Sequence, residues 1–283
     1  MNDNMEEEYI KEKCPVCGGD IMTTNEGWKC DNQMNAVTPC PFSVEKQING
    51  ATITEDIVHE LCQYGRSRIL TMKDKTGKLY LAHLDVQNGR VEMVPEGLYL
   101  KHRCPHCGGR IQITSKGYYC ENSLGKHPTC KFHCNGILSH RFITPDELEA
   151  YLDRHPTIID GCFNSQGRIF SAILMENESY GMSLTSIVGK CPLCGDDVLV
   201  SPVAFNCCNH HQAGEPYHMS IWRHVKGYNV TLEDLKEILT YGITTKPVVL
   251  NSENGTLSKA YLRLSEDKTH IVPDFNIRDE DVV

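Results

Sequence analysis

The sequence has no apolar run of the length that a membrane-spanning helix needs, so we expect no membrane segment. Its first residues, MNDNMEEEYIKEK, are acidic and lack the apolar core of a secretory signal peptide. We therefore expect a protein of the reducing cytoplasm. In that compartment, cysteines in C-x-x-C pairs are more often metal ligands or redox groups than disulfides.

Basic residues are also scarce, because 28 Lys and Arg stand against 37 Asp and Glu and give a formal net charge of −9. This balance argues against a protein that coats nucleic acid with its whole surface, since phosphate binding depends on Lys and Arg. The exception is the segment from 101 to 141, in which Glu121 is the single acid. Its basic residues are Lys101, Arg103, Arg110, Lys116, Lys126, Lys131 and Arg141.

Cysteine, in contrast, is abundant, and eleven of the fifteen cysteines follow an internal repeat. The stretches CPVCGGDIM, CPHCGGRIQ and CPLCGDDVL begin at Cys14, Cys104 and Cys191, in steps of 90 and then 87 residues. A second pattern, in ITEDIVHEL, ITPDELEAYL and VTLEDLKEIL, keeps the same steps. Two dissimilar patterns that share one period indicate three copies of one unit.

The second half of each unit predicts a short helix followed by strands. Thr231 with Asp234 is typical of an N-cap and capping box before an amphipathic stretch. The first and third helices are predicted to end at Gly65 and Gly242. Short β-like runs separated by turn residues follow, and Asn88-Gly89 predicts a tight hairpin.

We therefore predict an α+β fold of three tandem units, each a small zinc ribbon followed by a short helix packed on an antiparallel β meander. The units cover 14–100, 101–188 and 189–272, between acidic tails at 1–13 and 273–283. Within them, the ribbons span 14–46, 101–136 and 189–222, and the α+β modules span 50–100, 140–188 and 228–272.

We call the cysteine-rich first half of each unit its front. The cysteines of the first two fronts share the spacing C-x2-C-x12-C-x9-C, which is close to that of a zinc ribbon. A redox pair would explain the first C-x-x-C but not the second pair. The cysteines are also unlike small hydrophobic residues of a core, because these fronts have few large apolar residues with which to form one. We therefore predict Zn²⁺ at two four-cysteine sites, whose ligands are Cys14, Cys17, Cys30 and Cys40, and Cys104, Cys107, Cys120 and Cys130.

The third front departs from this spacing at its fourth ligand. Cys191, Cys194 and Cys207 keep the register, but Tyr217 occupies the fourth position and His218 follows it. We predict a Zn²⁺ site of these three cysteines and His218. The residues that compete for its last two positions are Cys208, His210 and His211.

Aromatic residues recur beside the cysteines. Trp28, Tyr118 and Phe205 each precede a third cysteine by two residues, and Phe42 and Phe132 follow the fourth. These rings either cover the metal sites and pack on the next module, or form a face on which unpaired bases stack beside Lys and Arg. On the second hypothesis the nucleic-acid contacts are Trp28, Phe42, Lys101, Arg103, Arg110, Lys116, Tyr118, Tyr119, Lys126, Lys131 and Phe132.

The four-cysteine fronts resemble the zinc-ribbon repeats at the C-terminal end of bacterial type IA DNA topoisomerases. The back half of the second unit, GCFNSQGRIFSAIL, resembles another repeat of some of these enzymes, through Gly161, Phe163, Ser165, Gly167, Arg168, Phe170 and Ala172. The resemblance does not extend to the family's catalytic region, with its strand-exchanging tyrosine and acidic metal site. It therefore implies only the accessory roles, which are binding of single-stranded DNA and, in some cases, docking to RNA polymerase.

We expect a non-catalytic accessory protein that binds single-stranded or distorted DNA through its zinc ribbons, mainly the second. The alternative, favoured by the net negative charge, is a docking module for RNA polymerase or for a replication or topoisomerase partner, with purely structural ribbons. A third hypothesis is an enzyme with a catalytic zinc at the third site, near His210, His211, His218 and His224. The sequence lacks the H-E-x-x-H and H-x-E patterns that would support it.

Overall fold

The computed structural model describes residues 8–35, 37–209, 219–251 and 255–276. Contacts between Cα atoms divide the chain into two compact units. The first is Met1–Ile137 with Phe142–Pro145, and the second is Leu138–Arg141 with Asp146–Val283. The division falls inside the second copy of the sequence repeat.

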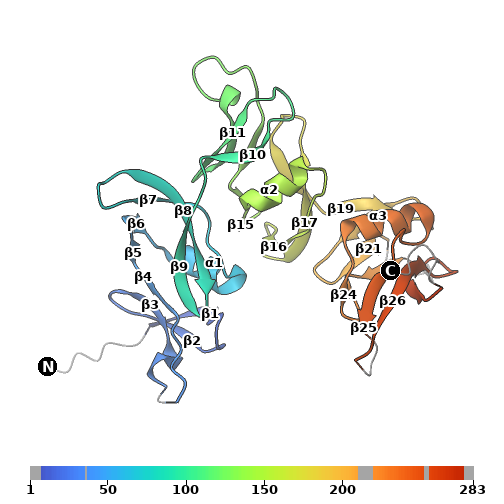
Figure 1. Cartoon of the computed structure of the whole chain (residues 1–283), viewed down its shortest axis with the longest axis horizontal. Helices are drawn as coiled ribbons and strands as arrows, with labels where there is room; N and C mark the ends of the chain where they lie inside the picture. Colours follow the sequence, from blue (N-terminus) through green and yellow to red (C-terminus); the bar gives the residue numbers. More distant parts are fainter. Residues whose placement is uncertain (1–7, 36, 210–218, 252–254, 277–283) are drawn as a thin grey trace. The chain divides into compact units, whose positions relative to one another are not determined.

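The first unit contains two four-stranded antiparallel sheets, ribbon 1 and ribbon 2, each with one set of repeated cysteines (Figure 1). Ribbon 1 consists of β1 (Glu8–Lys13), β2 (Asp20–Thr23), β3 (Gly27–Cys30) and β4 (Ser43–Glu45). It is followed by the hairpin β5 (Gln47–Ile48) and β6 (Ala51–Thr52), helix α1 (Glu55–Tyr64), and the meander β7 (Leu70–Lys73), β8 (Leu79–Gln87) and β9 (Arg90–Pro95). Ribbon 2 consists of β10 (Tyr99–Arg103), β11 (Arg110–Thr114), β12 (Gly117–Cys120) and β13 (His133–Asn135). Short 3-10 helices at Asp31–Met34 and Glu121–Ser123 follow β3 and β12.

The second repeat continues through the hairpin β14 (Ile137–Leu138) and β15 (Arg141–Phe142) and helix α2 (Pro145–Leu152) to the meander β16 (Ile159–Phe163), β17 (Ile169–Glu176) and β18 (Met182–Thr185). Ribbon 3 consists of β19 (Ile187–Lys190), β20 (Asp197–Val200), β21 (Ala204–Cys207) and β22 (Ser220–Trp222). After it come the hairpin β23 (His224–Val225) and β24 (Tyr228–Asn229), helix α3 (Leu232–Tyr241) and the meander β25 (Val248–Asn251), β26 (Leu257–Leu264) and β27 (Ile271–Asp274).

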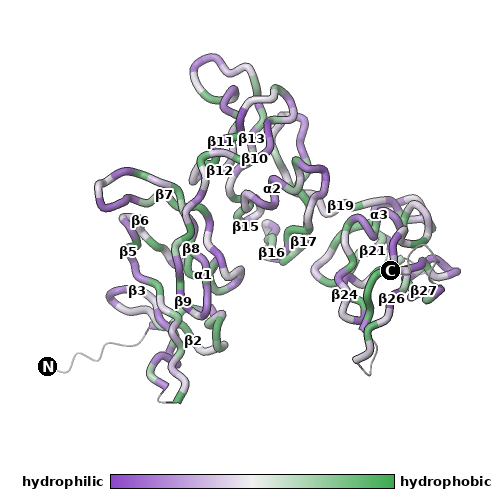
Figure 2. Tube along the Cα trace, in the orientation of Figure 1, coloured by the Kyte–Doolittle hydropathy of each residue, from purple (hydrophilic) through white to green (hydrophobic). Residues whose placement is uncertain are grey.

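The same order of ribbon, hairpin, helix and meander occurs three times, which is consistent with three tandem units of mostly small antiparallel sheets. Among the described residues, none of the helices has the length and apolarity that crossing a membrane requires. Figure 2 shows green and purple stretches interspersed along the trace instead of one long apolar segment.

Several local predictions are confirmed. The Thr231 side chain accepts a hydrogen bond from the backbone N–H of Asp234, and a complete capping box opens α3. Helices α1 and α3 end at Gly65 and Gly242, which adopt the left-handed conformation (φ 70° and 78°) that glycine tolerates best. The β8–β9 hairpin turns at Asn88-Gly89, as predicted.

The ribbon boundaries differ from those predicted. Strand β1 brings residues 8–13 into ribbon 1, although the sequence analysis placed them in an acidic tail. Ribbons 2 and 3 likewise begin earlier, at Tyr99 and Ile187. The strand before each C-x-x-C pair lies at the edge of its sheet and exposes much of its length, so it lacks a hydrophobic signature. At the other end, β27 extends to Asp274, whose Oδ2 atom accepts a hydrogen bond from Nε of Arg263 at 2.8 Å.

Each described core joins a ribbon to the module that follows it. In the first repeat, the buried cluster contains Trp28 of β3, Leu61 of α1 and Leu84 of β8 together. In the third repeat, Phe205 of β21 shares a cluster with Leu235 of α3 and Leu262 of β26. A ribbon too small to bury much surface alone therefore completes its core with the helix and meander beside it.

Candidate metal centres and the outer face of ribbon 2

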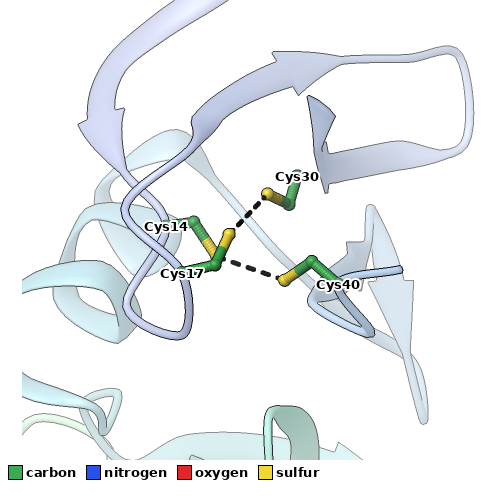
Figure 3. A group of neighbouring side chains, drawn as sticks. All are labelled: Cys14, Cys17, Cys30 and Cys40. Carbon is green, nitrogen blue, oxygen red and sulfur yellow. Dashed lines mark hydrogen bonds between the residues drawn. The ribbon is translucent and has the colours of Figure 1, made fainter. Parts of the chain in front are cut away.

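The predicted cysteines of ribbon 1 come together at one end of the sheet (Figure 3). Cys14 and Cys17 lie on the turn between β1 and β2, Cys30 ends β3, and Cys40 lies just before β4. The Sγ atoms of Cys14 and Cys40 are 3.6 Å apart, and those of Cys17 and Cys30 are 3.4 Å apart. All four sulfurs lie within 4.8 Å of one another.

Ribbon 2 repeats this arrangement, and ribbon 3 repeats part of it. The Sγ distances are again 3.6 Å between Cys104 and Cys130, and 3.4 Å between Cys107 and Cys120. In ribbon 3 the three predicted cysteines cluster, with Cys194 and Cys207 at 3.5 Å. The predicted fourth ligand, His218, and its competitors His210 and His211 lie outside the described residues. Cys208 is exposed and is not a member of the cluster.

These geometries fit a tetrahedral metal ion bound by thiolates. Zn–S bonds of about 2.3 Å place the sulfurs of a tetrahedron about 3.8 Å apart, close to the observed spacings. A disulfide would require about 2.05 Å, and all fifteen cysteines are free thiols. The donor set of four thiolates favours zinc among the divalent metals of cells.

The glycine that follows each C-x-x-C explains how the turn presents its sulfurs. Gly18, Gly108 and Gly195 have φ values of 74°, 71° and 79°, a backbone conformation that side chains rarely adopt. The backbone N–H of Gly18 donates to the carbonyl of Cys14 at 2.9 Å, and the other two glycines do the same at their cysteines. The tight turn thereby brings both cysteines of the pair to one side.

An asparagine that the sequence analysis missed also contacts each cluster. The side-chain amides of Asn32 and Asn122 donate to the Sγ atoms of Cys17 and Cys107, in both cases at 3.4 Å. Asn209 makes the equivalent contact in ribbon 3 at 4.0 Å. The signal was present in the sequence, because an asparagine stands two residues after the third cysteine of every unit.

In ribbons 1 and 2, these amides favour the thiolate at the exposed cysteine of the cluster. Hydrogen bonds from Asn32 and from the backbone of Gly19 lower the pKa of Cys17 to about 7. The corresponding bonds from Asn122 and Gly109 lower the pKa of Cys107 to about 6. Burial acts in the opposite direction and raises the pKa of Cys30 and Cys120. In ribbons 1 and 2, the ionised form that a metal requires is thus reached most readily at the second cysteine.

Four of the five aromatic residues proposed as a stacking surface are buried, which corrects their assignment. Phe42 and Phe132 are fully buried, Trp28 is 7% exposed, and Tyr118 is 1% exposed. The Tyr118 hydroxyl donates to the carbonyl of Ile143 at 2.6 Å. The rings belong to the side of each sheet that packs on the module, so their faces are not accessible to a base.

The predicted basic residues of ribbon 2 are exposed. Lys116 lies on the β11–β12 turn, and Lys126 and Lys131 lie on the loop before β13. Lys101, Arg103 and Arg110 lie on β10 and β11. In contrast, Arg141 of the second repeat is buried, and its guanidinium pairs with the Glu147 carboxylate at 2.8 Å (N to O), so it adds no surface charge.

Tyr119, the remaining predicted aromatic, lies on the side of ribbon 2 opposite to Tyr118. Successive residues of a strand point to opposite faces, and Tyr119 is partly exposed where Tyr118 is buried. The strand register places Tyr99, Gln112, Tyr119 and His133 in one row across all four strands. We call this row, together with Lys101, Arg103 and Arg110, the outer face of ribbon 2.

Contacts within the outer face hold its rings in place. The Tyr119 and His133 rings are parallel, with centroids 6.2 Å apart and an interplanar angle of 7°. The guanidinium carbon of Arg110 lies 4.3 Å from the centroid of the Tyr99 ring. Arg110 also donates from Nε to Glu121 at 3.0 Å. The face therefore combines ordered aromatic rings with cationic groups.

Comparison with known proteins gives one weak but extended similarity. No family model matches the chain, and no solved structure matches it. Among curated proteins, it is similar to a protein named DNA topoisomerase 1 from Bacillus anthracis, with 24% identity over 205 residues. The aligned region covers 69% of this chain but only 23% of the length of that protein.

Proposed function

We propose that this chain is a non-catalytic accessory protein that binds single-stranded DNA through the outer face of ribbon 2. Zinc ions at the cysteine clusters hold the ribbons in shape. The similarity to a protein named DNA topoisomerase 1 supports a role on DNA. Because the chain spans 23% of that protein, the similarity does not carry that protein's activity with it.

The observation that carries the proposal is the row of Tyr99, Gln112, Tyr119 and His133 beside three cationic side chains. Proteins that bind single strands without sequence preference combine aromatic platforms with Lys and Arg. The planar side chains of this row lie on four adjacent strands, which are about 4.8 Å apart. A single strand that crosses the sheet would meet a stacking group together with cations that contact its phosphates.

The other ribbons lack this combination at the same register positions. The row in ribbon 1 is Tyr9, Met22, Lys29 and Ser43, and that in ribbon 3 is Ile187, Leu199, Asn206 and Ser220. Neither row contains paired aromatic rings. This difference supports assigning the main binding surface to ribbon 2.

The proposal is tested by fluorescence anisotropy of a labelled single-stranded oligonucleotide at two salt concentrations. Tyr119→Asn, which copies Asn206 of ribbon 3, should weaken binding about tenfold, because a stacked base contributes about 1–3 kcal/mol. The matched control is Tyr118→Phe, which copies Phe205 of ribbon 3 and should leave the affinity unchanged. Equal effects of the two substitutions, or absence of binding at low salt, would overturn the proposal.

The alternative is a docking module for RNA polymerase or for a replication or topoisomerase partner, and nothing in the comparisons supports the polymerase. The name of the similar protein refers to DNA and not to a polymerase. The hypothesis of a catalytic zinc at the third site gains no support from His224, the one of its four histidines that the structure describes. His224 lies on β23, and its Nδ1 atom is 2.8 Å from Oδ1 of Asn229. It does not belong to the cysteine cluster.

A further inference from the structure

A groove recurs at equivalent positions of ribbons 2 and 3. In ribbon 3, a groove of about 390 Å³ is lined by Pro202 and Val203 of the β20–β21 turn, Trp222 of β22, and His224 and Asn229 of the following hairpin. In ribbon 2, a groove of about 460 Å³ is lined by the matching residues 87 positions earlier. These include Ser115, Lys116, Asn135, Ile137 and Phe142, and Arg68 and Ile69 of the first repeat line this groove as well. The recurrence indicates that the groove is a property of the ribbon-plus-hairpin architecture.

The ribbon 3 groove has an exposed tryptophan, whereas the aromatic residues that line its counterpart, Tyr118, Tyr119 and Phe142, are buried or half-buried. Trp222 is 62% exposed, and its neighbour Val203 is 59% exposed. The other tryptophan, Trp28, is 7% exposed and belongs to the core. Trp222 takes the place of Asn135 in ribbon 2 and Glu45 in ribbon 1, since the strand register pairs these residues with Ala204, Gly117 and Gly27. The fold therefore does not require an aromatic residue at this position.

Arg223 holds the groove in a defined shape. Its guanidinium donates to both carboxylate oxygens of Asp160, at 2.7 and 2.9 Å. It also donates to the carbonyls of Ser201 and Pro202, at 3.0 and 3.2 Å. These bonds tie the turn that carries Val203 to the strand that carries Trp222. A ligand would meet a largely ordered groove, which reduces the entropy lost on binding.

The charge of the lining favours a base over an acidic or basic peptide. Among the residues that the structure describes, none that lines the groove carries a carboxylate, although the chain has 37 acidic residues. The positive charge of Arg223 is balanced by Asp160. The surface therefore neither repels a polyanion nor attracts one strongly, so binding there would depend on the indole ring and on the polar side chains of His224 and Asn229.

We propose that the ribbon 3 groove binds one unpaired nucleobase by stacking on Trp222, with His224 and Asn229 as the polar groups beside the base. This inference rests on the proposed binding of single-stranded DNA and adds a second contact point, on a different ribbon. An apolar peptide is the competing occupant, and it is distinguished by the test below.

The tryptophans themselves provide the measurement. The variant Trp28→Phe, which copies Phe205 of ribbon 3, leaves Trp222 as the single tryptophan of the chain. Oligothymidylate is titrated while tryptophan emission and the anisotropy of a labelled oligonucleotide are followed in parallel. Stacking should quench the Trp222 emission, and the quenching should saturate together with the anisotropy. If Trp28→Phe does not fold, the emission of the unmodified chain minus that of Trp222→Asn supplies the same signal.

The variant Trp222→Asn copies Asn135 and adds a test of affinity. It should weaken binding about fivefold without changing the salt dependence, because stacking releases no counterions. Anisotropy binding without quenching, and with unchanged affinity in Trp222→Asn, would overturn this inference while leaving the proposed function intact. Absence of anisotropy binding at low salt would instead overturn the proposed function, and this inference with it.

Discussion

Arg103 lies directly opposite Arg110 across the β10–β11 pair of ribbon 2, at the position where the other two ribbons have a Lys–Asp ion pair. Lys13 faces Asp20 in ribbon 1, and Lys190 faces Asp197 in ribbon 3, where Nζ and Oδ1 are 2.7 Å apart. In ribbon 2 the acid is replaced by a second cation, and Arg110 turns to Glu121 instead. The same position therefore carries a neutral pair in ribbons 1 and 3 and an excess of positive charge in ribbon 2.

Replacing Arg110 by Asp should give ribbon 2 a cation opposite an acid at this position, as in ribbons 1 and 3. We expect Arg110→Asp to weaken oligonucleotide binding and to lower the slope of log K against log salt by about 1, because fewer counterions are released from the strand. The measurement is an anisotropy titration across a series of salt concentrations. The reciprocal variant Asp20→Arg should increase the affinity. An unchanged slope in both variants would show that this position does not contact phosphate.

Loss of one ligand should remove one metal ion and loosen the shared core. We expect Cys107→Ser to bind one zinc ion fewer than the unmodified chain in native mass spectrometry. It should also lower the unfolding temperature, since the other three ligands of the cluster are buried, as are the neighbouring rings of Tyr118 and Phe132. Cys62→Ser is the control, because Cys62 belongs to none of the cysteine clusters. Equal zinc content in both variants would contradict the metal assignment.

Asn122 should control the pH at which zinc leaves ribbon 2. Its amide lowers the pKa of Cys107, so Asn122→Ala should raise that pKa toward the ordinary thiol value. A higher pKa leaves more of the thiol protonated at a given pH, and protons compete with zinc for the sulfur. Zinc release on acidification, followed with a chromogenic chelator, should therefore begin at a higher pH in the variant, with about 10–100-fold weaker metal binding. Identical release curves would refute this role.

The ion pair of Asp160 with Arg223 should stabilise the second of the two compact units in a pH-dependent way. Burial opposes ionisation of Asp160, but the hydrogen bonds from Arg223 and Ser171 outweigh it and hold the pKa below its usual value. A depressed carboxyl pKa contributes stability above the pKa of the unfolded chain, and this contribution is lost as the pH falls through the folded value.

Asp160→Asn should therefore lower the free energy of unfolding at pH 7 by about 0.2–1 kcal/mol, as for a partly exposed pair, and the difference should shrink below about pH 4. Denaturant titrations at the two pH values measure this, and a difference that grows on acidification would have the wrong sign.

The features that the sequence predicted are those encoded by spacing. Identical cysteine gaps identified two complete clusters, and the glycine after each pair has the positive φ that its turn needs. Thr231 and Gly242 likewise marked the limits of α3, because caps depend on local chemistry. In each case the information lies within a few residues or in a fixed period.

The features that it missed depend on which face of a strand is covered. Tyr118 and Tyr119 are adjacent, and composition alone cannot tell which of them points to the core. The answer comes from the module residue Ile143, whose carbonyl accepts the Tyr118 hydroxyl, 25 positions away. Strand β1 was missed for a related reason, since an exposed edge strand needs no alternation of apolar residues.

Photochemical cross-linking would locate the DNA-binding surface of the unmodified chain. The zinc-loaded chain is irradiated in the presence of an unmodified single-stranded oligonucleotide, and the cross-linked peptides are identified by mass spectrometry. We expect adducts on peptides that contain Tyr99 or Tyr119, with a lower yield in Arg110→Asp and an unchanged yield in Tyr118→Phe. Cross-links that fall entirely outside ribbon 2 would contradict the assignment of its outer face as the main DNA-binding surface.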